Sequence, residues 1–76
     1  MSAKEMFEEL NFWERINDEW HIVYSYKNVK FTFYKRTHRY EIELSHIYHE
    51  DNLAIPFPQK IKKAINKQIE ELEWYK

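Results

Sequence analysis

Between residues 21 and 45, apolar and polar side chains alternate almost without interruption. The apolar positions are Ile22, Tyr24, Tyr26, Val29, Phe31, Phe33, Tyr40, Ile42 and Leu44. Because successive side chains of a strand point to opposite faces of a sheet, this alternation predicts strands with one apolar face. We expect three consecutive strands, 21–27, 29–36 and 39–45, joined by very short turns.

Both ends of the chain carry the spacing of an amphipathic helix instead. Near the start, Ser2-x-x-Glu5 is a capping-box pattern, and Asn11 is suited to end the helix. The apolar stripe of this helix is Ala3, Met6, Phe7 and Leu10. Near the end, Pro58 is suited to the first position of a helix. The apolar stripe that follows it is Ile61, Ala64, Ile65, Ile69 and Leu72.

A short edge strand is expected at residues 12–16, with Phe12, Glu14 and Ile16 on one face. The element order α-β-β-β-β-α predicts one α+β domain over residues 1–76. We expect two layers: an antiparallel three- to four-stranded meander, with the N- and C-terminal helices on one face. The other face should present Val23, Ser25, Lys30, Thr32, Tyr34, Arg36, Glu41 and Glu43.

The last helix has its charges reversed relative to its dipole. Lysines occupy its first turns and glutamates its last turns, whereas the helix dipole prefers the opposite order. These residues are Lys60, Lys62, Lys63, Glu70, Glu71 and Glu73. Either the acidic first helix packs alongside and favours this layout, or an external acidic partner does.

The composition excludes several classes of protein. The chain has no cysteine, which excludes disulfides and thiolate zinc sites and is typical of a reducing cytosol. It has no glycine, which phosphate loops and dinucleotide-binding turns need. The start has acids where a signal peptide needs an apolar core, and no apolar run approaches the ~20 residues of a membrane span. We therefore expect a cytoplasmic protein without a cofactor and without a membrane partner.

Both predicted helices carry a resemblance. Residues 2–12 read Ser-Ala-Lys-Glu-Met-Phe-Glu-Glu-Leu-Asn-Phe, and residues 64–74 read Ala-Ile-Asn-Lys-Gln-Ile-Glu-Glu-Leu-Glu-Trp. Together with the tyrosine-rich strand 22–26, they resemble small phage and prophage proteins of Gram-positive bacteria that have no assigned function. That group usually has glycine where this chain has Asn11 and Glu73. The resemblance implies a bacterial cytosol and a mobile-element origin, and it implies no chemistry.

Candidate chemistry is sparse. His46-x-x-His49-Glu50-Asp51 has ligand types that suit a metal ion, but no third ligand is fixed by the spacing. We interpret these as surface histidines beside a turn. No serine has the glycine-flanked turn of hydrolases. A chain this short that uses its aromatic rings in a core also leaves little room for a pocket. We expect no catalysis.

Five basic residues follow one another without an intervening acid, which suggests a nucleic-acid-binding alternative. They are Lys27, Lys30, Lys35, Arg36 and Arg39. Basic residues with aromatic rings on a sheet can stack bases and follow phosphates. However, Glu41 and Glu43 on the next strand could pair with these cations and make a solvated charge ladder instead. Net charge is −1, so no global signal for polyanion binding exists.

The tryptophans favour a protein partner, since tryptophan is enriched in interface hot spots. Trp74 could be exposed on the last helix or could fold back over the core. Our interpretation is a small phage-type accessory protein that contacts a host or phage protein, with weak nucleic-acid binding through residues 27–39 as the alternative. The candidate interaction residues are Trp13, Lys27, Lys30, Tyr34, Arg36, Arg39 and Trp74.

Overall fold

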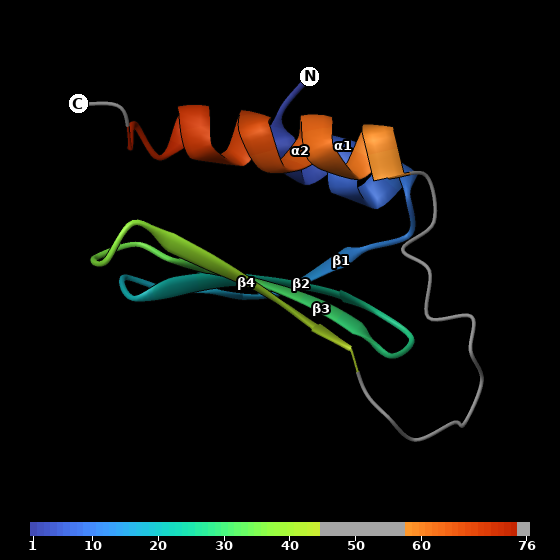
Figure 1. Cartoon of the computed structure of the whole chain (residues 1–76), viewed down its shortest axis with the longest axis horizontal. Coiled ribbons are helices and arrows are strands. Elements are labelled where there is room, and N and C mark those ends of the chain that lie inside the picture. Colours follow the sequence, from blue (N-terminus) through green and yellow to red (C-terminus); the bar gives the residue numbers. More distant parts are fainter. Residues whose placement is uncertain (45–57, 75–76) are drawn as a thin grey trace.

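Four antiparallel strands form one sheet, and both helices lie across the same face of it (Figure 1). The computed structural model describes residues 1–44 and 58–74. The elements are α1 (Ala3–Glu9), β1 (Trp13–Asn17), β2 (His21–Tyr26), β3 (Val29–Tyr34), β4 (Arg39–Leu44) and α2 (Pro58–Glu71). The strands neighbour one another in sequence order, β1-β2-β3-β4. The predicted two-layer α-β-β-β-β-α architecture is confirmed.

The core lies between the sheet and the helices and is largely aromatic. Its largest fully buried side chains are Phe7, Phe12, Tyr24, Phe31 and Phe33. The ring of Phe7 on α1 stacks on Tyr24 of β2, with 4.2 Å between centroids. The α2 helix adds Ile61, Ala64 and Ile65 to the same cluster. These residues occupy the predicted apolar positions of the sheet and of both helices, which is why one core joins the two layers.

One polar pair lies within this core. The hydroxyl of Tyr24 donates a hydrogen bond of 2.6 Å to Oε1 of Gln68, and both side chains are buried. Burial, reinforced by the charges of Glu14 and Glu71, raises the pKa of Tyr24 well above its usual value. The tyrosine is thus held neutral as a donor to an α2 side chain, which fixes how α2 sits over β2.

Strand β1 contains a bulge that the alternation of residues does not predict. Glu14 lies opposite Tyr24, but Ile16 lies opposite Val23, so Arg15 is the extra residue. The expectation that Phe12, Glu14 and Ile16 share one face is therefore wrong for Ile16. The bulge moves Ile16 to the face away from the helices, beside Trp13.

Both helices end in the same hydrogen-bonded arrangement. After α1, the N–H of Phe12 donates to the carbonyl of Phe7 at 2.9 Å, and Asn11 takes a φ of 68°. After α2, the N–H of Trp74 donates to the carbonyl of Ile69 at 3.3 Å. Glu73 there has a φ of 58°. Each is a Schellman motif with a left-handed residue just past the helix, a position usually taken by glycine.

The sequences of these two ends are alike: Phe-Glu-Glu-Leu-Asn-Phe at 7–12 and Ile-Glu-Glu-Leu-Glu-Trp at 69–74. In both, the final aromatic residue turns back toward the core. Phe12 is fully buried, and Trp74 packs against the core cluster with its ring 6.3 Å from that of Phe33. The fold-back of Trp74, one of two possibilities left open by the sequence, is what the structure shows.

The reversed charges of α2 are explained by its antiparallel neighbour. The backbone N–H of Ala3, at the start of α1, donates to Oε2 of Glu71 at 2.8 Å. At the opposite end, Lys60 and Lys63 lie across a shared groove from Glu9. The charges of α2 thus oppose its own dipole but match the dipole of α1. This arrangement favours packing against α1 over an external acidic partner as the reason for the layout.

Within residues 1–44 and 58–74, neither helix is long and apolar enough to cross a membrane.

Candidate functional site

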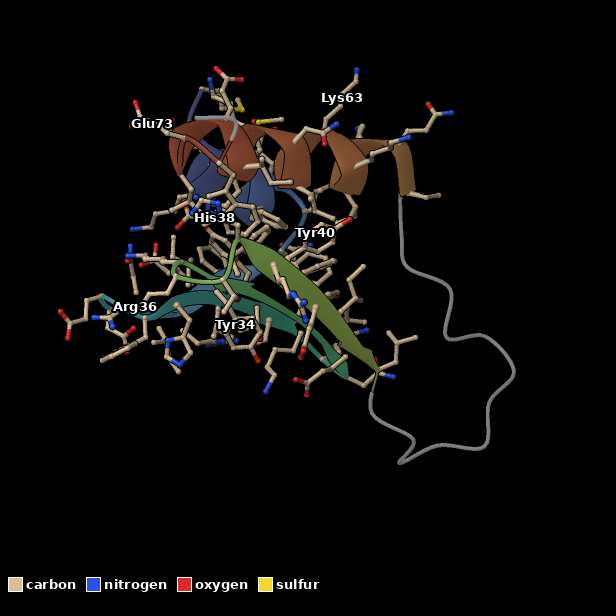
Figure 2. The ribbon with its side chains drawn as sticks, turned by 60° about the vertical axis from the view of Figure 1, so that its left-hand side comes forward. Tyr34, Arg36, His38, Tyr40, Lys63 and Glu73 are labelled. Carbon is tan, nitrogen blue, oxygen red and sulfur yellow. The ribbon has the colours of Figure 1, made fainter. Side chains whose placement is uncertain are left out.

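The sheet face opposite the helices, called the open face below, is organised as three rows of side chains across the strands. The first row is Trp13, Ser25, Lys30 and Glu43; the second is Ile16, Val23, Thr32 and Glu41; the third is His21, Tyr34 and Arg39. Of the predicted interaction residues, this face brings together Trp13, Lys30, Tyr34 and Arg39. Figure 2 shows Tyr34 pointing away from the helices, on the opposite side of the sheet from Tyr40.

The β1 side of the open face carries two large exposed apolar side chains, with Arg15 between them in the sequence. Trp13 keeps 48% of its surface exposed and Ile16 keeps 41%. They are neighbours here only because the bulge at Arg15 turns Ile16 outward. The backbone of β1 is held by its pairing with β2, and Nε of Arg15 donates to Oγ of Ser25 at 2.8 Å. Two large apolar side chains therefore stand on a fixed backbone in solvent.

Val23 and Thr32, at the centre of the open face, are buried rather than exposed as expected. Both are small, and they lie side by side in the second row, between Ile16 and Glu41. Since neither described helix covers this face, the surrounding side chains of the same face shield them. The open face thus has small, buried side chains at its centre and longer side chains around them.

The β4 side of the open face is charged, and its charges are mixed. Nζ of Lys30 lies 3.4 Å from Oε2 of Glu43, its cross-strand partner. The hydroxyl of Tyr34 donates to Oε2 of Glu41 at 3.4 Å. Desolvation and the Glu41 charge raise the pKa of Tyr34. Carboxylates thus interleave with the cations of the basic stretch, as in a charge ladder.

Arg36 lies in the turn between β3 and β4 and not on the sheet face where the sequence placed it. Its guanidinium carbon is 3.7 Å from the ring centroid of Trp20, a close cation–π contact. Trp20 stays 51% exposed. Trp20 lies in the turn between β1 and β2. The backbone of this turn is fixed because Oδ1 of Asp18 accepts the backbone N–H groups of Trp20 and His21, both at 2.8 Å. These bonds lower the pKa of Asp18.

Trp74 lies away from the patch formed by Trp13 and Ile16, whereas Lys27 lies near Ser25, the cross-strand partner of Trp13. Lys27 is in the β2–β3 turn, with Nζ 5.3 Å from the Tyr26 ring centroid. It lines a shallow hollow of about 480 Å³ that also contains Lys30 and Glu43. Trp74 belongs to the helix layer and stacks on His38, with ring centroids 5.4 Å apart. The predicted set of residues is therefore divided among separate surfaces.

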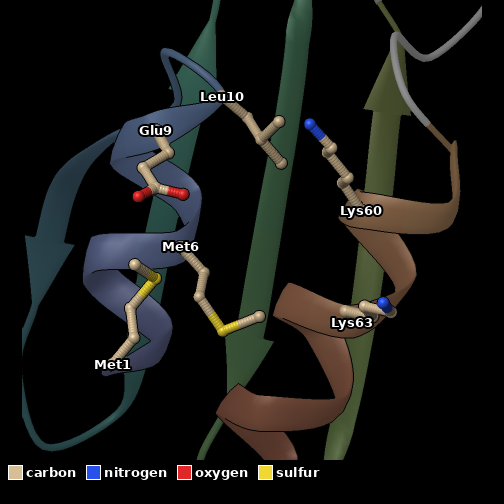
Figure 3. Close-up of a pocket in the computed structure, with 6 residues that line it drawn as sticks. All are labelled: Met1, Met6, Glu9, Leu10, Lys60 and Lys63. Carbon is tan, nitrogen blue, oxygen red and sulfur yellow. The ribbon is translucent and has the colours of Figure 1, made fainter.

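A second hollow lies between the two helices, on the side away from the sheet (Figure 3). It has a volume of about 450 Å³ and is lined by Met1, Met6, Glu9, Leu10, Lys60 and Lys63. Its floor is apolar and two lysines edge one side, opposite the carboxylate of Glu9. None of the predicted interaction residues contributes to it.

Metal ligands do not gather at either hollow. Among the residues that the structure describes, no three histidine or acidic side chains converge as ligands of a metal ion. His46, His49, Glu50 and Asp51, the cluster singled out in the sequence, lie outside the described residues. Tyr24, whose pKa shift is the largest described, is enclosed in the core and bonded to Gln68, so its shift is structural.

The candidate site that the described residues present is the patch of Trp13 and Ile16 on the open face. The sequence predicts only half of the patch of Trp13 and Ile16, because Trp13 is a candidate interaction residue but Ile16 is expected on the same face as Phe12 and Glu14. The alternation gives no signal for the bulge, because Glu14, which interrupts the apolar pattern, lies opposite Tyr24 as a regular strand would place it. Compared with family models, with curated proteins and with solved structures, the chain matches none.

Proposed function

We propose that this chain is a small phage-type accessory protein of the bacterial cytosol that acts by binding a host or phage protein. It performs no catalysis and needs no cofactor. The contact surface is the Trp13–Ile16 patch on the open face. The observation that carries this proposal is the exposure of both side chains, each above two fifths, next to each other on a bulged strand.

The surroundings of the patch support a protein partner. Protein interfaces combine an apolar centre, often with tryptophan, and a polar rim that excludes water. Here the apolar pair is bordered by Arg15 and Ser25, and the charged side of the face follows across the strands. The paired backbone of β1 reduces the entropy lost when Trp13 is fixed by a partner.

The nucleic-acid alternative has weaker support. Lys27 and Lys30 share a hollow with Glu43 at one end of β3, while Lys35 and Arg36 lie at the other end. The six residues of β3 separate the two groups by roughly 17 Å at about 3.3 Å per residue, more than one Debye length in physiological salt. Carboxylates also stand beside the cations, so no single basic track follows the sheet.

The test is affinity capture with a matched tryptophan control. Tagged wild-type protein, Trp13→Ala/Ile16→Thr and Trp20→Ala would be incubated with lysates of a Gram-positive host, with and without phage infection. Threonine keeps the β-branching that strands favour. Trp20 is as exposed as Trp13 but lies in the turn, so it controls for the general stickiness of an exposed indole.

We expect wild type and Trp20→Ala to enrich the same protein, and the double variant to lose it although its circular dichroism spectrum is unchanged. Equal capture by all three baits would contradict the proposal. If only Trp20→Ala failed to capture the protein, the binding site would instead be the turn between β1 and β2.

A further inference from the structure

Strand β4 forms an outer edge of the sheet that is open to solvent. In the described part of the chain, nothing pairs with its outer side. All five residues from Arg39 to Glu43 are exposed. Tyr40 and Ile42 point to the helix side of the sheet, yet they keep 43% and 40% of their surfaces exposed. An apolar strand edge of this kind is a template for pairing with another strand.

The two edges of the sheet differ in how they are protected. Strand β1 carries a bulge, which breaks the regular ladder and makes that edge a poor template. Strand β4 has no bulge. Its register with β3 is unbroken over six pairs, and Arg-Tyr-Glu-Ile-Glu-Leu contains neither proline nor lysine. The edge suited to strand addition is therefore β4.

We propose that β4 pairs antiparallel with β4 of a second copy of this chain, so that two sheets become one continuous sheet with a two-fold axis at Glu41. This surface differs from the Trp13–Ile16 patch, and the proposal does not rest on the proposed function. Both copies keep their helices on the same side. Residues directly opposite in an antiparallel pair share a face of the sheet. An axis between two residues would pair an open-face residue with a helix-side residue and put the helices of the two copies on opposite sides, so the axis must pass through a residue pair.

Charge selects the register. An axis at Ile42 would place Glu41 opposite Glu43 of the second copy twice, and like charges directly opposite are destabilising. An axis at Tyr40 would overlap only three residues of each strand. An axis at Glu41 overlaps five and places Arg39 of each copy opposite Glu43 of the other, on the open face.

The same register pairs the apolar side chains. Tyr40 of each copy faces Ile42 of the other on the helix side, an aromatic–β-branched pair of the kind that stabilises sheets. Two kinds of contact are unfavourable: Glu43 of both copies lies beside each Glu41, and Glu41 lies directly opposite Glu41 of the other copy. Each Glu41 carboxylate also has an Arg39 from both copies beside it, one along its own strand and one diagonally across. The strand is thus complementary to itself, which is why a second copy is the partner it fits.

The test uses charge reversal and rescue, measured by sedimentation equilibrium over a concentration series. We expect wild type to dimerise, and Arg39→Glu and Glu43→Arg each to weaken the dimer by about tenfold or more, because each places two like-charged pairs opposite one another. Mixed in equal amounts, these two variants should form heterodimers, since glutamate at 39 then faces arginine at 43 and the reverse.

Two controls separate pairing from folding and from net charge. Circular dichroism checks that each variant is folded, because Glu43→Arg also removes the ion pair with Lys30. Lys62→Glu reverses an exposed charge on α2 and should leave the dimer unchanged. Wild-type protein that stays monomeric at millimolar concentration would overturn the proposal. A dimer indifferent to Arg39→Glu, or a mixture without heterodimers, would overturn it equally.

Discussion

Replacing Phe31 by alanine tests whether the aromatic cluster is what stabilises the fold. Phe31 lies at the centre of β3 and is fully buried. Its ring centroid is 5.1 Å from that of Phe12 and 5.5 Å from that of Phe7. The substitution would therefore leave a cavity between the sheet and α1, where the neighbouring rings are themselves held by the core.

The magnitude follows from the buried area. A phenylalanine ring removes roughly 150–250 Å² from water. At about 25 cal/mol per Å², this amounts to roughly 4–6 kcal/mol as an upper limit. Measured phenylalanine-to-alanine changes in cores cost about 3–5 kcal/mol. A 76-residue domain is typically stable by about 4–11 kcal/mol, so this variant should be close to unfolding or unfolded.

Urea titration followed by circular dichroism measures the effect. Trp13→Ala is the control: it removes an even larger ring, but one that is 48% exposed, and it should cost less than about 1 kcal/mol. Phe31→Leu should lie between the two variants. A loss below about 1 kcal/mol for Phe31→Ala would refute the assignment of this ring to the centre of the core.

Three further predictions concern the backbone, pH and nucleic acid. Lys27 has a φ of 54°, so Lys27→Gly should raise the free energy of unfolding by roughly 0.5–1 kcal/mol in thermal denaturation. Asn11→Gly should change the free energy of unfolding less, because asparagine tolerates the left-handed region. A lower free energy of unfolding for Lys27→Gly than for wild type would contradict the prediction. The pKa of Tyr24 is raised in the folded state, so its contribution to stability is complete below pH 10 and is lost as pH rises above that value. Wild type should therefore lose more stability than Tyr24→Phe between pH 9 and 12, and parallel curves would argue against a buried neutral hydroxyl. Labelled single-stranded and duplex oligonucleotides should show negligible binding in fluorescence anisotropy at physiological salt, whereas binding with a log–log salt slope of roughly −3 to −4 would support the nucleic-acid alternative.

The sequence was sufficient for the order of the elements and for most of the core. Alternation placed Tyr24, Phe31 and Phe33 on the covered face, and helical spacing placed Phe7 and Ile61 against them. These patterns succeed because each element must bury its apolar side in a chain this short. The capping box of Ser2 and Glu5 is formed as expected, since it depends on local spacing alone.

The features that the sequence did not predict depend on irregular backbone conformation and on contacts with other elements. The bulge at Arg15 is one extra residue, which period-two reasoning cannot place, and it decides where Ile16 points. The left-handed residues fall on Lys27, His38 and Glu73 in a chain without glycine, so the usual marker of such positions is missing.

Tyr40 and Ile42 have the same alternation as the buried positions of β3, yet they are exposed. Their exposure depends on how far the described helices extend across the sheet. The alternation of residues within one strand carries no information about this. Trp74 shows the opposite case. Its turn back to the core follows from the helix-ending arrangement that it shares with Phe12, and the likeness of residues 7–12 and 69–74 was readable in advance.

The most direct test of the Trp13–Ile16 patch uses the indole N–H signals of the chain's three tryptophans in a nitrogen–proton correlation spectrum. Trp13 lies on the open face, Trp20 in the turn and Trp74 in the helix layer, so each signal reports on a different surface. On titration with the protein that the wild-type bait captures, the Trp13 signal should shift or broaden while the Trp74 signal stays in place. A complex in which the Trp20 or Trp74 signal changes and the Trp13 signal does not would contradict the assignment of the binding surface.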